Sequence, residues 1–119
     1  MVKQIIVMRR YFPDPKDSTQ VRKLRLGKQI SQGAHASCAV LTHILLRSQE
    51  MEQVPYLTVE QKLWLGGQFT KICVYVDTEE ELIELYNKCL ENKLTAHLIT
   101  DAGLTEFNGV PTITALGIG

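Results

Sequence analysis

The chain has 119 residues and no net formal charge, and its shares of hydrophobic (45%) and charged (22%) residues are those of an ordinary globular domain. No apolar run approaches the roughly 20 residues that cross a bilayer, and the first run, residues 5–8, is shorter than the core of a signal peptide. The composition therefore argues against a membrane-spanning or secreted protein, and it predicts a single cytoplasmic domain over residues 1–119.

The first half of the chain predicts a strand, a long loop and a long helix. Residues 3–9, KQIIVMR, are rich in β-branched side chains, which is typical of a buried strand. Residues 10–26 contain two prolines and no apolar periodicity, so we expect a long loop. From Gly27 to about Glu50, apolar residues recur at three- and four-residue steps and predict a helix. The expected buried stripe of this helix comprises Ile30, Ala34, Cys38 or Ser37, Leu41, Ile44 and Leu45.

The next segment predicts two further helices with a strand between them. Thr58 is followed three residues later by Gln61, which is the pattern of a capping box at the start of a short helix. Residues 71–76, KICVYV, predict a second strand. Thr78 precedes three glutamates, which favour the positive end of a helix, and this helix should end near Asn92.

Two short apolar runs close the chain and complete the predicted fold. Residues 96–100 and 111–118 are expected strands, and the segment between them contains two glycines and an N-G pair, typical of a turn. Helical crossovers join parallel strands, whereas a short turn joins antiparallel ones. We therefore predict an α/β domain in which helices cover a mixed four-stranded sheet.

Charge is distributed unevenly along the chain. Residues 1–28 carry eight basic and two acidic side chains, whereas the rest of the chain carries five basic and eleven acidic ones. A positive end of this kind could meet the phosphate backbone of a nucleic acid. A solvated loop whose charges only aid solubility explains the same pattern equally well.

The cysteines and histidines do not form a metal-binding pattern. The three cysteines are odd in number, widely spaced and without a C-x-x-C pair, and the three histidines do not complete a site with ligands at short spacing. We therefore expect reduced thiols and no metal. The closing GVPTITALGIG has G-x-G without the third glycine, so no dinucleotide cofactor is expected either.

One polar stripe lies on the long predicted helix. Lys28, Gln32 and His35 fall within roughly 60° of one another around a helix axis, and small residues flank them. The macrodipole disfavours a lysine in the first turn unless an anion or a negatively charged transition state compensates for it. Taken singly, Lys28 is more simply a surface lysine and His35 a hydrogen-bonded histidine.

A second candidate group follows the strand expected at residues 96–100. In the sequence TDAGLT, Asp101 could accept a proton or orient a water molecule, and Thr105 could donate or accept a hydrogen bond. Ligands of α/β sheets tend to bind at the carboxyl ends of strands. The plainer alternatives are that Asp101 only caps its own turn and that Thr114 is only a β-branched strand residue.

Taken together, these segments resemble one family over essentially the whole chain, the peptidyl-tRNA hydrolases of the second type. KQIIVMR resembles the first strand of that family, KLRLGKQISQGAHAS its lysine-bearing helix, GGQFTKICVYV its G-Q-x-K strand, and LITDAGLTEF and TITALGIG its last two motifs. Each motif is weak alone, but five in the right order are highly specific. The resemblance implies a three-layer α/β/α fold without a metal, often a homodimer, and cleavage of the ester between a peptide and the 3′ ribose of tRNA.

The resemblance also implies which residues form the site. The family's lysine, aspartate and two threonines correspond to a catalytic set of Lys28, Asp101, Thr105 and Thr114. Gln32, His35 and Lys71 also match the family and are expected to bind the tRNA. The basic first 28 residues add Arg9 and Arg25 to this expected binding set. In the expected mechanism, Asp101 orients or deprotonates a water molecule, and Lys28 stabilises the oxyanion or the departing ribose oxygen.

The sequence departs from the family pattern at several points. Leu26 stands where the family usually has a lysine, Thr100 stands where it usually has a glutamine, and the loop at residues 10–23 is longer than usual. The family also usually continues beyond the position of Gly119. A second hypothesis is therefore a non-catalytic relative that binds tRNA or a protein partner on the same scaffold. A third is an acyltransferase or a hydrolase of simple esters.

Overall fold

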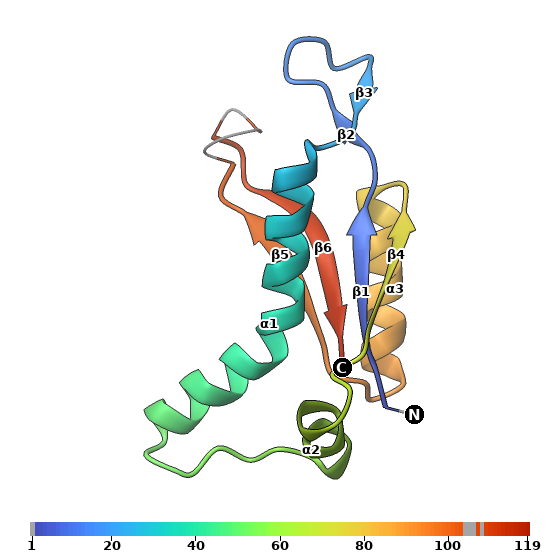
Figure 1. Ribbon diagram of the computed structural model, residues 1–119. Coiled ribbons are helices and arrows are strands. Elements are labelled where there is room, and N and C mark those ends of the chain that lie inside the picture. The colour runs from blue at the N-terminus through green and yellow to red at the C-terminus, as the bar shows by residue number, and fades with distance from the viewer. Residues whose placement is uncertain (1, 104–106, 108) are drawn as a thin grey trace.

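The protein is described by a computed structural model that covers residues 2–103, 107 and 109–119. Its main sheet has four strands in the order β4-β1-β6-β5, with α1 over one face, α3 over the other and α2 at one end (Figure 1). The predicted α/β fold with a mixed four-stranded sheet between helical layers is confirmed. Within the described residues, no helix has both the length and the apolar character to span a membrane.

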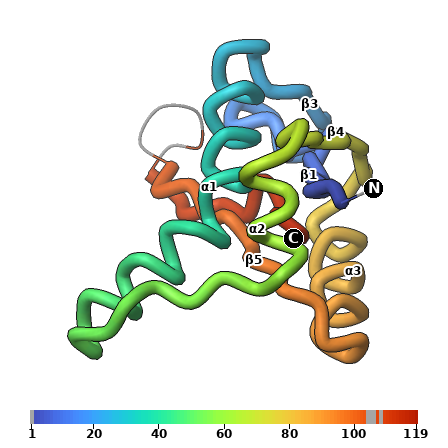
Figure 2. The backbone as a smooth tube through the Cα atoms, turned by 60° about the horizontal axis from the view of Figure 1, so that its bottom comes forward, coloured from blue at the N-terminus to red at the C-terminus, as the bar shows by residue number. Residues whose placement is uncertain are grey.

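Three of the four strands run in the same direction. β1 pairs in parallel with β4, whereas β6 pairs antiparallel with both β1 and β5, so the carboxyl ends of β1, β4 and β5 meet at one end of the sheet, where α1 begins (Figures 1 and 2). The strands are β1 (Gln4–Arg9), β4 (Lys71–Val76), β5 (Ala96–Asp101) and β6 (Thr112–Ile118). The helices are α1 (Leu26–Glu50), α2 (Val59–Gly66) and α3 (Glu79–Glu91).

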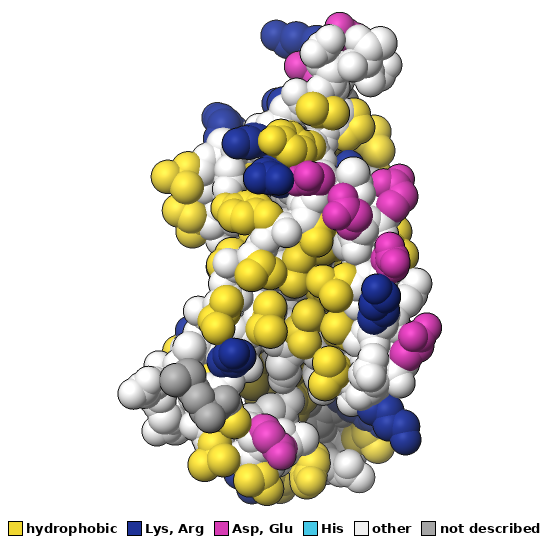
Figure 3. Space-filling view, turned by 90° about the vertical axis from the view of Figure 1, so that its right-hand side faces the viewer, with side chains coloured by type: hydrophobic (Ala, Val, Ile, Leu, Met, Phe, Trp, Pro, Cys, Tyr) yellow, Lys and Arg dark blue, Asp and Glu magenta, His cyan; other side chains and the backbone are white. Residues whose placement is uncertain are grey.

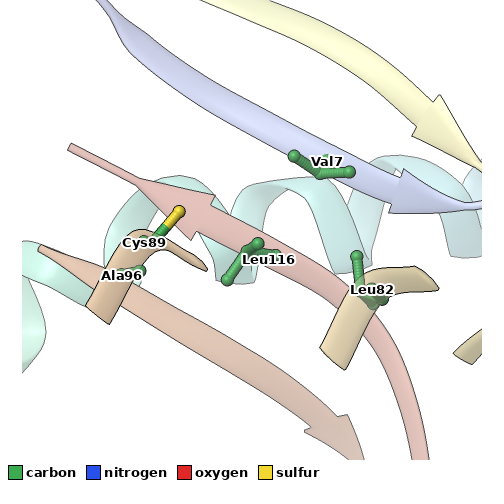
Figure 4. Close-up of a cluster of buried hydrophobic side chains, with 5 residues drawn as sticks. All are labelled: Val7, Leu82, Cys89, Ala96 and Leu116. Carbon is green, nitrogen blue, oxygen red and sulfur yellow. The ribbon is translucent and has the colours of Figure 1, made fainter. Parts of the chain in front are cut away.

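The α3 face of the sheet carries a conventional apolar core. Val7 and Leu116 from the sheet pack against Leu82 and Cys89 of α3, with Ala96 at the edge of the cluster (Figure 4). The start of α3 follows the predicted cap, because the Thr78 hydroxyl accepts a hydrogen bond from the backbone of the third helical residue. The capping box predicted at the start of α2 is also present in full.

Helix α1 turns a different face to the sheet than its apolar pattern predicts. Ile30 and Leu45, both expected in the core, are 64% and 57% exposed, and the large side chains of the helix mostly face solvent. Small side chains replace them because the helix lies very close to β6: a Cβ atom on Gly117 would stand only 2.1 Å from the carbonyl oxygen of Ala36. The residues that α1 buries are Gln32, Ala36, Ala39 and Val40.

The segment predicted as a long loop contains a short hairpin, so that prediction is wrong in part. β2 (Phe12–Pro13) pairs antiparallel with β3 (Val21–Arg22) beyond the end of β1. Phe12 forms a small separate core with Leu24 and Phe107, and the two phenylalanine rings lie 5.2 Å apart. This core fixes the base of the hairpin beside the start of α1. Strands of two residues are too short to show periodicity in the sequence.

Candidate active site

A partly buried ion pair joins the first turn of α1 to the end of β5. The Nζ atom of Lys28 lies 2.9 Å from Oδ1 of Asp101, and the two side chains are only 16% and 14% exposed. The two residues are 73 positions apart in the sequence, so only the fold brings them together. The polar stripe on α1 and the aspartate after the third long strand therefore converge, as the sequence predicts.

A chain of buried hydrogen bonds connects this ion pair to the interior of the protein. The Gln32 side-chain amide donates to Oδ1 of Asp101 over 3.3 Å, and its carbonyl oxygen accepts a hydrogen bond of 2.6 Å from the Thr114 hydroxyl. Gln32 is 1% exposed and Thr114 is completely buried. Both side chains are therefore shielded from solvent and are linked to Asp101 through hydrogen bonds.

A β-bulge in β6 turns Thr114 toward this chain. Ile99 of β5 pairs with Ala115, but the next residue, Thr100, pairs with Ile113, so Thr114 has no partner in the ladder. Ala115 packs on the α1 side and Ile113 on the α3 side, and the extra residue between them leaves both Thr114 and Ala115 facing α1. Bulges often re-aim a side chain beside an active site in this way.

The carboxylate of Asp101 is held in its charged form. Burial would raise its pKa, but the hydrogen bond and charge of Lys28, the backbone N–H of Gly103 and the Gln32 amide together outweigh burial and lower the pKa below its usual value. The Gly103 N–H donates to Oδ2 over 2.9 Å. Gly103 has a φ of +82°, and a Cβ atom there would meet the backbone of Val110 at 2.2 Å, so this turn requires glycine.

The structure spreads the remaining predicted residues more widely. Arg25 precedes α1 at the same end of the sheet as Lys28, and His35 lies on the exposed side of α1. Lys71 begins β4, in register with the first residue of β1, and therefore lies at the opposite end of the sheet from Asp101. Thr105 lies outside the described residues.

Arg9 is the last residue of β1 and lies near the site, but its guanidinium group makes contacts with other residues of the fold. Its Nε atom donates to the carbonyl of Tyr11 and its Nη1 atom to the carbonyl of Ile113, over 2.9 and 3.2 Å. The guanidinium also lies 4.3 Å from the ring centre of Phe12. Burial lowers the pKa of Arg9, partly offset by the charges of glutamates at the start of α3. Arg9 thus ties the hairpin to β6.

Comparison with known proteins shows the family of the chain. The family model of Peptidyl-tRNA hydrolase PTH2 matches residues 2–119. The chain belongs to this family. A relative from Methanopyrus kandleri, named peptidyl-tRNA hydrolase, is 35% identical over the whole chain and 84% of its own length.

Two further relatives carry the same name. The peptidyl-tRNA hydrolase of Sulfolobus acidocaldarius is 36% identical over 78% of this chain and 73% of its own length. The peptidyl-tRNA hydrolase of Aeropyrum pernix is 38% identical over 76% of this chain and 70% of its own length.

Three features of the candidate site in this member of the peptidyl-tRNA hydrolase family are not visible in the sequence pattern. The hydrogen bond from the Gly103 backbone N–H to Asp101 involves no side chain of Gly103, so the sequence does not indicate it, although the glycine itself indicates a turn. The burial of Gln32 is hidden because its neighbours on the sheet side are small. The bulge at Thr114 depends on the register with β5, which no local pattern encodes.

Proposed function

We propose that this protein hydrolyses the ester bond between a peptide, or an N-blocked amino acid, and the 3′ end of tRNA, releasing free tRNA. Its membership of the peptidyl-tRNA hydrolase family supports the reaction. The single structural observation that carries the proposal is the 2.9 Å contact between Lys28 and Asp101 at the carboxyl ends of the strands.

Lys28 supplies positive charge where negative charge develops. Its ammonium group is mostly shielded from water and is held by Asp101 in the first turn of α1. Attack on an ester places negative charge first on the carbonyl oxygen and then on the departing ribose oxygen, and a fixed cation stabilises both. A preorganised group of this kind is typically worth about 10²–10³ in rate.

Asp101 orients the attacking water and the lysine. Each of its oxygens already accepts at least one hydrogen bond, and its lowered pKa makes it a weak base at neutral pH. These contacts favour an orienting role over complete removal of a proton from water. Thr105 is proposed to help hold the water molecule.

Gln32 and Thr114 are proposed as positioning residues. The 2.6 Å hydrogen bond from the Thr114 hydroxyl fixes the Gln32 carbonyl oxygen, so the amide group must turn its N–H toward Asp101. Because both residues are buried, their contribution comes from holding the carboxylate in one orientation.

The basic end of the molecule is proposed to hold the tRNA. Arg25 and the hairpin of β2 and β3 extend from the end of the sheet that carries Lys28 and Asp101 (Figure 1). Phosphate contacts from this end would make binding fall steeply with salt. Roles for His35 and Lys71 in binding the tRNA, a homodimer and a cytoplasmic location also belong to the proposal.

The non-catalytic alternative is less well supported. A binding module has no need for a shielded lysine–carboxylate pair with its own buried hydrogen-bond chain. Such a module would bind tRNA without releasing the peptide, and a hydrolase of simple esters would not be inhibited by excess tRNA.

Turnover of peptidyl-tRNA tests the proposal. We expect Lys28→Ala and Asp101→Asn each to lower kcat by about 10²–10³ while leaving the affinity for tRNA close to that of the wild type. Lys62→Ala, which removes an exposed lysine of α2, is the matched control and should keep full turnover. Wild-type protein that binds tRNA but releases none from N-blocked aminoacyl-tRNA would refute the proposed activity.

A further inference from the structure

A cleft of about 320 Å³ opens at the end of the sheet that carries Lys28 and Asp101. Three segments form its walls: the end of β1 with the β2 strand that follows, the start of α3, and the residues that lead into β6 (Figure 1). Cavities of about 300 Å³ and more can hold small ligands or parts of larger ones. The mechanism proposed above makes no use of this cleft.

The cleft begins one strand away from the Lys28–Asp101 pair. Thr112, which lines it, is the register partner of Asp101, and opposed residues of antiparallel strands have Cα atoms about 4.5–5.5 Å apart. Arg9 also lines the cleft and donates to the carbonyl of Ile113, so the cleft extends from β6 to the end of β1. Neighbouring strands lie about 4.8 Å apart, so an extended chain would pass from Asp101 to Arg9 in about three residues.

The wall between the cleft and the candidate active site is held by its own hydrogen bonds. The Gly109 N–H donates to the carbonyl of Gly103 over 2.7 Å. The Thr112 hydroxyl donates over 2.8 Å to the carbonyl of Val110, whose backbone also packs against Gly103. Because the Gly103 N–H donates to Asp101, a ligand on this wall would have a fixed position relative to the carboxylate.

The walls of the cleft have the chemistry of a peptide-binding surface. Four of the residues that line it are apolar and exposed, namely Pro13, Pro15, Val110 and Pro111. Such side chains offer a surface to apolar parts of a ligand. A proline also lacks a backbone N–H but keeps its carbonyl, so these walls can accept hydrogen bonds from peptide N–H groups and offer few donors to phosphate oxygens.

The charge around the cleft is mainly negative. Asp14 and Glu79 line it, and Glu80 lies in the same first turn of α3. Arg9 is the only basic residue among the described residues of the lining, and its guanidinium already donates to two backbone carbonyls. Figure 3 views the side that carries α3, and acidic side chains gather in the upper half of this view, below the hairpin. Such a surface repels the phosphates of tRNA and attracts cations.

The basic residues of the same end lie in a different segment. Arg22 belongs to β3, and Lys23 and Arg25 connect β3 to α1. The described lining of the cleft takes residues from β2 and the turn after it, and none from β3 or from this basic connection. The two ends of a peptidyl-tRNA would therefore separate by charge, with the RNA beside the start of α1 and the peptide beside the start of α3.

We propose that this cleft binds the peptide part of the substrate and favours a cationic side chain at the second or third residue from the ester, with Glu79 as the residue that recognises it. The inference rests on the proposed hydrolase function and adds to it a preference among peptides. One oxygen of Asp14 already accepts a hydrogen bond from the Lys16 N–H, so Glu79 is the better placed of the two carboxylates to receive a cation.

Binding of non-hydrolysable analogues tests this preference without depending on hydrolysis. The two analogues are the same tRNA carrying acetyl-Lys-Lys-Ala or acetyl-Glu-Glu-Ala at its 3′ end, through an amide in place of the ester. Because the tRNA is identical, its contribution cancels in the ratio of the two dissociation constants. We expect the wild-type protein to bind the lysine analogue about three- to fivefold more tightly than the glutamate analogue.

Reversal of the charge at Glu79 provides the second measurement. Glu79→Lys should shift the ratio of dissociation constants at least about tenfold toward the glutamate analogue, because like charges then meet in the cleft. Glu60→Lys is the matched control, since it makes the same change in the first turn of α2, at the other end of the sheet (Figure 1). It should leave the ratio unchanged. Circular dichroism would establish that both variants are folded.

Three results would overturn the proposal. They are the absence of measurable binding of either analogue, equal dissociation constants for the two analogues, and equal shifts of their ratio in Glu79→Lys and Glu60→Lys. Release of tRNA from the corresponding esters is measured separately. A protein that releases tRNA without the preference would keep the hydrolase function and lose the peptide site, whereas one with the preference but without release would lose only the proposed reaction.

Discussion

The two halves of α1 are held in place by different forces. Residues 26–40 lie against the sheet, bury Gln32, Ala36, Ala39 and Val40, and carry the lysine that pairs with Asp101. Residues 41–50 bury no side chain fully, and this half projects beyond the sheet (Figures 1 and 2). A stack of His43 on His97 of β5, with ring centres 4.0 Å apart, connects this half to the sheet.

The difference shows that packing against the sheet can fix the position of one half of a helix while the other half lies mostly in solvent. The amino-terminal half uses small side chains to approach β6 closely, which fixes the position of Lys28 beside Asp101. The carboxyl-terminal half follows helix propensity without such packing. Substitutions in the first half should therefore affect activity and stability strongly, and substitutions in the second half should not.

After the loss of Lys28 or Asp101 themselves, the largest effect is expected from breaking the hydrogen-bond chain that Gln32 forms in the first half. Gln32→Leu removes the hydrogen bond to Asp101 and leaves the Thr114 hydroxyl without its acceptor. Hydrogen bonds to charged groups are worth about 1.5–3 kcal/mol, so we expect kcat for peptidyl-tRNA to fall about ten- to hundredfold with little change in KM. Thr114→Ser should retain most of the activity, and equal losses for Thr114→Ser and Thr114→Val would argue against the positioning role.

A smaller but clear effect is expected where α1 meets β6. Gly117→Ala places a methyl group against the carbonyl of Ala36 and should lower the free energy of unfolding by about 1–3 kcal/mol, measured by urea denaturation. Gly27→Ala is the control at the start of the same helix, because nothing lies within 4 Å of its Cβ position. If the two variants were equally stable, the close approach would not constrain the helix.

The contact of the second half of α1 with β5 predicts a modest dependence on pH. Burial, and then the nearby His43, lower the pKa of His97, so the folded protein takes up a proton less readily than the unfolded chain does. The free energy of unfolding should be fully maintained above the ordinary histidine pKa of about 6.5 and should decline as the pH falls through it. His97→Gln should flatten this decline in denaturation curves measured across that range.

The smallest effect is expected in the second half. Leu45→Ala should change the free energy of unfolding by less than about 0.5 kcal/mol, because the side chain is already mostly in solvent. Val40→Ala removes a buried side chain five residues earlier and should cost more than about 1 kcal/mol. If both variants lost a similar amount of free energy of unfolding, Leu45 would have to be buried in solution, and the second half of the helix would be packed.

Much of the fold could be predicted from local patterns. The strands at residues 71–76 and 96–100 are compact apolar runs, and Thr58 and Thr78 mark helix starts through chemistry within one turn. The face of α1 could not be predicted this way, because periodicity favours large side chains while the close approach of β6 admits only small ones. The hairpin of β2 and β3 was missed because it is stabilised by the small separate core around Phe12, which includes residues outside the hairpin, and not by a pattern within its own strands.

The site was predictable to a similar degree. Lys28 and Asp101 were found through their motifs, and the ion pair between them follows once both lie at the carboxyl ends of the strands. Burial, by contrast, is a property of the assembled structure, so the sequence could not show that Gln32 and Thr114 are shielded from solvent while Lys28 and Asp101 stay partly exposed.

Because of the bulge in β6, the site depends on the number of residues in this strand as well as on their chemistry. Between Ile113 and Ala115 the strand carries one residue more than its partner β5 requires. Loss of that residue would let the two strands pair without interruption, yet no hydroxyl would then reach Gln32 from this position. A change in length alone could thus remove one support of the carboxylate while every other side chain of the site stayed intact.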